Sequence, residues 1–168
     1  LAYLVSVIDE IQEEVPLLLG QSDDDVLEYA YTQLSNELSA IATISSRAQA
    51  ISLLHPTEGW VFFSTDPALE GRERGNEDYF QMGREGLFVS PISYSVGREK
   101  PVLTISVPAY DANNQLLAVV AVEMNLNDLA NTLNSRVGLG DTGQSYLVDA
   151  YGFYVTLPSD IEENPLRT

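Results

Sequence analysis

The spacing of the hydrophobic residues changes once along the chain, near Ala48. Before this point apolar residues recur every three or four positions, which predicts amphipathic helices. The first stripe consists of Leu1, Leu4, Val5, Ile8, Ile11 and Val15, and the second of Leu27, Tyr31, Leu34, Leu38 and Ile41. After Ala48 the period falls to two, which is typical of strands. The chain is therefore predicted to be an α+β protein that begins with long helices.

Local signals suggest where these helices begin and end. Pro16 lacks a backbone N–H and is expected to bend or break the first helix. Ser22 is a natural N-cap for the second, and the acids Asp23–Asp25 follow it where the helix dipole favours anions. These acids are interpreted as capping residues rather than a cation site, because adjacent side chains on a helix diverge. The second stripe either faces the core or belongs to a helix that also supports a dimer.

Five segments after Ala48 are strand candidates: AISLLH, GWVFFST, FVSPISYS, KPVLTISVPAY and QLLAVVAVEMNL. The last two are joined by Asp111–Asn114, whose residues tolerate turn geometry, which predicts an antiparallel sheet. The last segment is apolar on both faces, so it is expected to be central and covered on both sides. The polar, glycine-rich segment before FVSPISYS is expected to be a loop with a short helix near Tyr79. A further helix is predicted for 127–136.

Composition excludes several classes of protein. The 168 residues are 45% hydrophobic, which is enough for a packed core. The net charge of −17 repels nucleic acid and anionic lipid, so neither is expected as a partner. No run of 18 apolar residues is present, and the first residues lack the basic start of a signal peptide. Because the chain begins without Met in the middle of a helical pattern, it is expected to be a piece of a longer protein.

The stretch VGLGDTGQSYLVDAYG contains G-x-G-x-x-G, formed by Gly138, Gly140 and Gly143. A dinucleotide site needs a strand before these glycines and a helix after them, because the helix N-terminus holds the pyrophosphate. Here a helical pattern comes first and a short strand-like run, SYLVD, follows. This order argues against a nucleotide cofactor, and no other cofactor is expected.

Nothing in the sequence supports catalysis or a metal centre. His55 is the only histidine and Cys is absent, so a transition-metal site and a Cys nucleophile are not expected. The segment DANNQLLAVVAVE resembles a calcium loop only at its start, since it lacks the glycine at position six and has Val122 where the closing Glu belongs. Neither a G-x-S-x-G motif nor a Walker loop occurs. We therefore expect no catalytic residues and no metal ligands, and a small hydrolase is disfavoured.

Basic residues are concentrated in one part of the chain. Five of the eight, Arg72, Arg74, Arg84, Arg98 and Lys100, interleave with Tyr79, Phe80 and Tyr94. Two interpretations remain open. They are ordinary solvated loop charges beside neighbouring acids, or they form a polar pocket for a small anion, because arginine pairs well with carboxylates.

The segment NEDYFQMGREGLFVSPISYSVGREKPVLTISVPAYDANNQLLAVVAVEMNLNDLANTL resembles the membrane-distal module of double Cache sensor domains, which are also called PAS-like or PDC domains. GDTGQSYLVDAYGFYVTLP is similar to the opening of their second, membrane-proximal module, so the glycines would lie at the crossing between modules. The resemblance covers roughly residues 45–158. It implies a helical segment at 1–46, a PAS-like ligand-binding module at 47–136, and a linker with the start of a smaller PAS-like module at 137–168.

The same resemblance implies the extracytoplasmic sensor of a transmembrane receptor, such as a histidine kinase or chemoreceptor. The receptor would be held in the membrane by helices outside this sequence, and its ligand would be a small carboxylate or amine. The amphipathic N-terminal helices predict a parallel homodimer in the full receptor, with weak association of this fragment alone. An interaction domain that binds a periplasmic protein and has no small-molecule ligand is the alternative.

The expected ligand-binding residues are Tyr79, Phe80, Ser90, Tyr94, Lys100, Tyr110 and Glu123. Among these, Tyr79, Tyr94, Lys100 and Glu123 are expected to contact the ligand. Tyr79 lies where the family has an aromatic lid residue, and Lys100 begins the strand that crosses under this lid. The amino-acid-binding subgroup has an arginine two residues before a Trp-Tyr pair, whereas these positions are Glu77, Tyr79 and Phe80 here, which argues against α-amino acids. Glu123 replaces that subgroup's aspartate, and it either pairs with Lys100 or meets a cationic group of the ligand.

Overall fold

The computed structural model describes residues 2–20, 23–45, 48–95, 100–124, 126 and 145–148. The chain divides into two compact units, one formed by Leu1–Ser90 with Thr104–Met124 and the other by Pro91–Leu103 with Asn125–Thr168. The elements in chain order are α1 (Ala2–Leu19), α2 (Asp24–Ser45), β1 (Ala48–Leu54), β2 (Val61–Ser64), the 3₁₀ turn η1 (Pro67–Leu69), α3 (Asp78–Gly83), β3 (Phe88–Val89), β4 (Ser93–Ser95), β5 (Lys100–Tyr110) and β6 (Leu116–Met124).

The first helix runs through Pro16, so a break, which was one of the two expected effects of this proline, does not occur. The proline removes one internal hydrogen bond, but its own carbonyl still accepts from the N–H of Gly20 at 3.0 Å. Its ring is exposed, while Ile11 and Val15 on the inner face of α1 are fully buried. Burial of this stripe therefore outweighs the loss of one bond near the end of the helix.

The second helix begins at Asp24, where the carbonyl of Asp23 accepts from the N–H groups of Val26 and Leu27, both at 3.0 Å. The expected N-cap, Ser22, lies outside the described residues. Leu34 and Leu38 are fully buried in the same core cluster as Ile11. The second stripe is thus core-facing in this part, as one of its two interpretations required.

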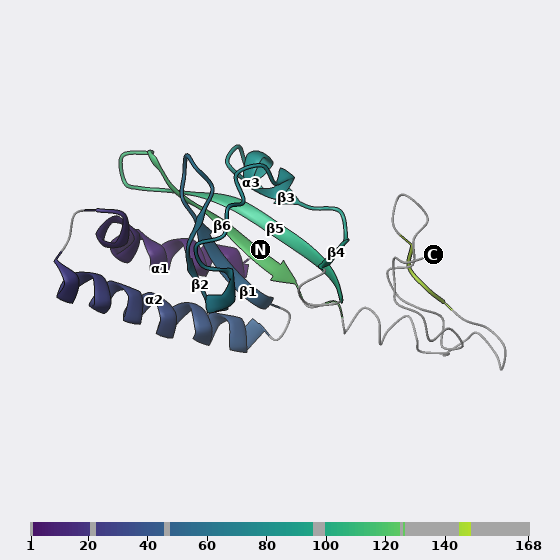
Figure 1. Cartoon of the computed structure of the whole chain (residues 1–168), viewed down its shortest axis with the longest axis horizontal. Coiled ribbons are helices and arrows are strands. Elements are labelled where there is room, and N and C mark those ends of the chain that lie inside the picture. The colour runs from purple at the N-terminus through teal and green to yellow at the C-terminus, as the bar shows by residue number, and fades with distance from the viewer. Residues whose placement is uncertain are drawn as a thin grey trace. The chain divides into compact units, whose positions relative to one another are not determined.

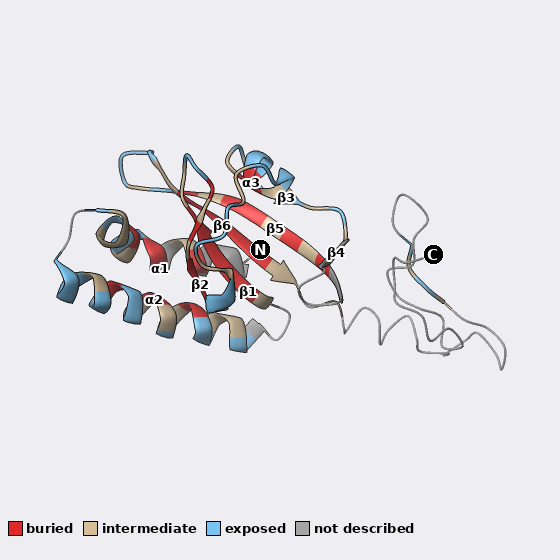
Figure 2. Ribbon diagram, viewed as in Figure 1, coloured by how far each residue is buried: buried red, intermediate tan, exposed pale blue. Residues whose placement is uncertain are grey.

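The sheet has the order β2-β1-β6-β5-β3, and β6 is central. Its residues Ala118–Val122 are buried. Val120 and Val122 pack with α1 and α2 on one face, whereas Val119 and Ala121 pack with Phe80 of α3 on the other. Figure 1 shows this layering, with the long helices on one side of the sheet and α3 on the opposite side, and Figure 2 shows the buried strands between them. The prediction of a central strand covered on both faces is confirmed.

The segment FVSPISYS forms two short strands instead of one. β3 pairs with β5 through Phe88 and Val89, and in the second unit β4 pairs with residues 100–102 of β5. Pro91 stands between them and has no N–H to donate to a ladder. Before it, Ser90 bonds Thr104 twice, its N–H to the carbonyl at 2.8 Å and its hydroxyl oxygen to the N–H at 3.0 Å. The ladder therefore ends at the proline.

The hairpin between β5 and β6 turns at Asp111–Asn114 as predicted. Asn114 has a φ of 62°, in the left-handed region that asparagine tolerates. One Asp111 carboxylate oxygen accepts from the N–H groups of Gln115 at 2.7 Å and Asn113 at 2.9 Å, and these bonds hold the pKa of Asp111 below its ordinary value.

Some predicted features lie outside the described residues, namely the helix at 127–136 and the glycines Gly138, Gly140 and Gly143. Within the described part, none of the helices combines the length and apolarity needed to cross a membrane.

Candidate functional site

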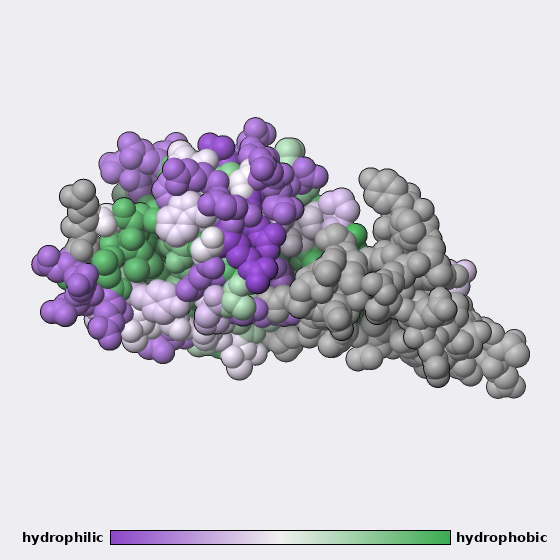
Figure 3. Space-filling view, in the orientation of Figure 1, coloured by the Kyte–Doolittle hydropathy of each residue, from purple (hydrophilic) through white to green (hydrophobic). Residues whose placement is uncertain are grey.

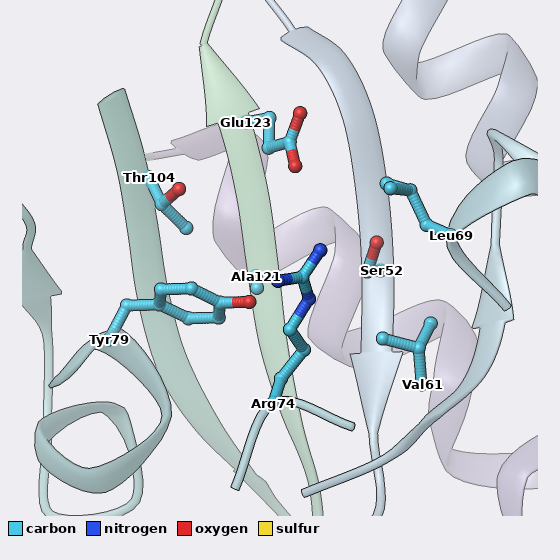
Figure 4. Close-up of a pocket in the computed structure, with 8 residues that line it drawn as sticks. All are labelled: Ser52, Val61, Leu69, Arg74, Tyr79, Thr104, Ala121 and Glu123. Atoms are coloured by element: carbon cyan, nitrogen blue, oxygen red, sulfur yellow. The ribbon is translucent and has the colours of Figure 1, made fainter. Parts of the chain in front are cut away.

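A small pocket opens on the α3 side of the sheet in the first unit (Figure 4). Its lining residues come from six elements (β1, β2, η1, α3, β5 and β6) and from the loop before α3: Ser52, Val61, Leu69, Arg74, Tyr79, Thr104, Ala121 and Glu123. The sheet forms the floor, since Ser52 pairs with Ala121 across β1 and β6 and their side chains share a face. Figure 4 shows the Tyr79 hydroxyl and the Arg74 guanidinium meeting over this floor, with the Glu123 carboxylate beside them.

Arg74 is placed by a close contact between two glycine backbones. The Arg74 N–H donates to the carbonyl of Gly59 at 3.0 Å, and a Cβ on Gly59 would lie 2.6 Å from the Cα of Gly75. Gly59 also has a φ of +78°, which disfavours any other residue. A second hydrogen bond joins the same two segments, because the N–H of Val61 donates to the carbonyl of Arg72 at 3.0 Å. Residues 71–75 are therefore held along the turn and start of β2, and this brings Arg74 to the pocket.

Tyr79 is placed by the packing of α3 on β5. The Ser106 hydroxyl donates to the Tyr79 carbonyl at 2.6 Å, and a Cβ on Gly83 would lie 2.5 Å from the same hydroxyl oxygen. Phe80, 1% exposed, anchors the helix in the cluster around Val119. Because these contacts fix the helix, the Tyr79 side chain is directed over the sheet.

The charges at the pocket are of both signs. An Arg74 guanidinium nitrogen lies 3.5 Å from a carboxylate oxygen of Glu77, and the Arg74 side chain is 29% exposed. Burial raises the pKa of Tyr79 to about 12; Arg74 opposes this change, and the carboxylates of Glu77 and Glu123 add to it. Tyr79 is thus a neutral hydroxyl at physiological pH and can donate a hydrogen bond.

The closed part of the pocket is about 10 Å³, and about 290 Å³ of space free of protein atoms lies in and around its mouth. The closed part alone has room for about one water molecule. A guanidinium, a carboxylate and a phenol hydroxyl around such a space provide donors for an anion and an acceptor for a cation. The arrangement suits recognition of a small polar molecule.

Residues 2–165 match the family model described as Cache domain. This chain belongs to the Cache domain family. The family named by the resemblance is therefore confirmed, and so is the PAS-like fold of N-terminal helices followed by an antiparallel sheet. A search of curated proteins gave no significant match to this Cache domain.

Solved structures share this fold at low sequence identity. The ligand-binding domain of the Campylobacter jejuni chemoreceptor Tlp3, in complex with 4-methylisoleucine, superposes with a TM-score of 0.66 at 16% identity, over 95% of this chain and 60% of that one. The ligand-binding domain of the Pseudomonas aeruginosa amino acid chemoreceptor PctC, in complex with GABA, gives 0.56 at 22% identity, over 93% and 67%. The sensor domain of the Vibrio cholerae histidine kinase DctB gives 0.58 at 16% identity, over 80% and 55%. The chain thus spans about 60% of the Tlp3 domain.

In this Cache domain, two of the seven predicted binding residues, Tyr79 and Glu123, line the pocket. Phe80 lies in the core beneath α3, and Ser90 bonds Thr104 at the end of β3. Tyr110 ends β5, six residues or roughly 20 Å along the strand from the lining residue Thr104. The side chains of Tyr94 and Lys100 lie outside the described ones. The role of each in binding stays a prediction.

The pocket also contains residues that the sequence did not single out, such as Ser52, Thr104 and Leu69. Arg74 was noted only as one of five basic residues. Of the others with described side chains, Arg72 donates from Nε to the carbonyl of Ala68 at 2.8 Å, and the Arg84 guanidinium carbon lies 5.6 Å from the centre of the Phe80 ring. Figure 3 shows hydrophilic residues gathered over α3 and the loops beside it. Arg74 is therefore the basic side chain for which a binding role has structural support.

His55 has a structural environment. Its ring stacks on Trp60 with 5.7 Å between centroids, and its Nδ1 accepts from the N–H of Glu58 at 3.3 Å. Within the described part of the chain, no three His, Asp or Glu residues gather closely enough to hold a metal ion.

Proposed function

We propose that this chain is the extracytoplasmic sensing part of a transmembrane receptor, a sensor histidine kinase or a chemoreceptor. It binds a small molecule that carries a carboxylate, an amine or both, in the pocket between α3 and the sheet, and it carries out no reaction. The observation that carries the proposal is the meeting of Arg74, Tyr79 and Glu123 over one hollow (Figure 4).

Three neighbours with this fold support the sensing role, because they are the sensory domains of two chemoreceptors and a histidine kinase. The ligands in two of those structures, 4-methylisoleucine and GABA, each carry an amine and a carboxylate. In this chain Arg74 would hold the carboxylate, for which its planar donor fork is suited. Glu123 would accept from the amine, and the neutral Tyr79 would donate to a ligand oxygen.

The proposed organisation has three parts. Residues 1–46 form the helical segment, 47–136 the membrane-distal binding module, and 137–168 the linker and start of the proximal module. The membrane-spanning helices would belong to the rest of the receptor.

A thermal-shift series tests ligand binding. The probes are succinate and acetate as carboxylates, ethanolamine and putrescine as amines, and β-alanine and γ-aminobutyrate as molecules with both groups. A probe at 100 times its Kd is expected to raise Tm by roughly 5–10 °C, because binding to the folded state alone stabilises it by about 2.7 kcal/mol. No shift with any probe would favour the interaction domain that binds a periplasmic protein.

Two substitutions test which group of the ligand each charged side chain binds. Arg74→Met is expected to weaken binding of a carboxylate probe, and Glu123→Gln that of an amine probe, each by roughly 10- to 100-fold, since a hydrogen bond to a charged group contributes about 1.5–3 kcal/mol. Calorimetry measures the affinities. The matched controls are Arg72→Met and Glu85→Gln, which change residues that do not line the pocket. Wild-type affinity in both pocket variants would show that the ligand binds elsewhere, and Lys100→Met would then be the next variant.

We also propose weak homodimerisation through the outer face of α2. Val26, Tyr29 and Ile44 on this helix are 38%, 60% and 85% exposed. Sedimentation equilibrium is expected to show partial dimer at millimolar concentration, because a short helical seam gains little by itself. Ile44→Lys should reduce the dimer fraction, and a strictly monomeric wild-type chain would contradict the proposal for this fragment.

A further inference from the structure

Glu70 joins three elements through one carboxylate oxygen. This Oε1 accepts from the Tyr31 hydroxyl on α2 at 2.9 Å and from the N–H of Ser64 at the end of β2, also at 2.9 Å. Glu70 itself follows η1 directly and is half-buried. The long helix, the sheet edge and the loop after η1 are thus joined at one side chain.

The turn η1 and the loop that follows it form one wall of the pocket. We call residues 66–74 the wall segment, because Leu69 and Arg74 within it line the pocket. Hydrogen bonds connect the residues of this segment to one another, since the N–H of Leu69 donates to the carbonyl of Asp66 at 3.0 Å and the N–H of Arg72 to the carbonyl of Leu69 at 3.3 Å. A displacement of Arg74 or Leu69 therefore acts on Glu70.

Tyr31 is held between this wall and the sheet. Its ring meets the Phe63 ring edge-on, with 5.3 Å between centroids, and Phe63 is fully buried in β2. Burial, followed by the Glu70 hydrogen bond, raises the pKa of Tyr31, which keeps its hydroxyl protonated and donating. The ring fixes the position of Tyr31, and the hydroxyl connects it to the wall segment.

We propose that the Tyr31–Glu70 hydrogen bond couples the pocket to α2, so that a change in the wall segment on ligand binding alters the packing of this helix. Coupling of this kind is reciprocal: a change at α2 must also alter the wall segment. The existence of a ligand rests on the function proposed above, whereas the link is tested without one.

Amide hydrogen exchange on the whole 168-residue chain measures the effect of α2 on the wall. Tyr31→Phe removes the hydroxyl and keeps the ring against Phe63. Exchange at Gly71, Arg72 and Arg74 is expected to be about three- to tenfold faster, which is the effect of losing one hydrogen bond of ordinary strength. Tyr29→Phe on the same helix is the control and is expected to change nothing there. Glu70→Gln keeps an acceptor oxygen and should retain part of the protection.

NMR of labelled tyrosine rings measures the effect of the pocket on α2. Arg74→Met is expected to shift the Tyr31 signal and leave Tyr29 in place, and the shift should vanish when Arg74→Met is introduced into a Glu70→Ala background. Unchanged exchange in Tyr31→Phe, or an equal Tyr31 shift with and without Glu70, would overturn the link. If no probe of the thermal-shift series binds but the exchange and NMR effects are both observed, the proposed ligand is refuted and the link between Tyr31 and Glu70 stands.

Discussion

Replacing Gly59 by alanine is expected to lower the free energy of unfolding by about 3 kcal/mol, of which about 1–2 kcal/mol comes from the left-handed backbone and the rest from overpacking. Gly59 has a φ of +78°, and an added Cβ would lie 2.6 Å from the Cα of Gly75 and 2.9 Å from the Phe80 ring. Neither neighbour can give way easily, because one is backbone and the other is a core residue. The same crowding should displace Arg74, which hydrogen-bonds to Gly59.

Gly71→Ala is the matched control for this substitution. Gly71 has a φ of +73°, yet an added Cβ would meet nothing within 4 Å. The Gly71→Ala variant should therefore lose only the part of the free energy of unfolding that comes from the left-handed backbone, about 1–2 kcal/mol. Gly75→Ala tests the same contact from the other side, since its Cβ would lie 2.5 Å from the carbonyl oxygen of Glu58. Urea unfolding measures all three variants. Equal losses for Gly59→Ala and Gly71→Ala would mean that the glycine contact does not hold the loop.

Most of the fold follows from the period of the hydrophobic residues. The apolar run of β6 predicted a central strand because only a strand covered on both faces can bury Val119 and Val120 together, and the structure buries both. The predictions failed where one residue was weighed without its surroundings. Pro16 breaks an isolated helix, but here the buried face of α1 outweighs one lost bond. Conversely, FVSPISYS has the composition of one strand, and Pro91 ends its ladder.

The candidate site was less accessible to prediction than the fold. Tyr79 and Glu123 were named because the family resemblance carried them over, and both line the pocket. Arg74 had no such signal, because its position depends on a contact between Gly59 and Gly75, which are 16 positions apart in the sequence. Glycine spacing does not reveal which two glycines will touch. Tyr110 illustrates the opposite case: it shares β5 with Thr104 but lies farther along the strand.

The second large effect is expected at alkaline pH and comes from Tyr79. Burial raises its pKa from 10.0 to about 12, so between these values the unfolded chain has lost the proton and the folded chain has kept it. The folded state then binds more protons, and stability must fall as pH rises through this window. The part of the folding stability that depends on protonated Tyr79 is fully present below pH 10 and is lost as the pH rises to 12. The loss amounts to about 2–3 kcal/mol, because each tenfold difference in proton affinity between the two states is worth about 1.4 kcal/mol.

Tyr79→Phe should make the fall in stability between pH 10 and pH 12 shallower by this amount, whereas Tyr29→Phe, at a residue 60% exposed, should leave it unchanged. Urea midpoints across this range are compared between the variants. Because Tyr31 is present in all of them, its own effect on the pH dependence of stability cancels. Parallel pH profiles for wild type and Tyr79→Phe would show that the Tyr79 hydroxyl is better hydrated than its burial implies. The outcome bears on function, because a hydroxyl that stays protonated far above neutral pH is a fixed donor beside Arg74 and Glu123. Such a donor favours an oxygen atom of the ligand whatever the pH of the medium, so recognition at Tyr79 should not vary over the physiological range.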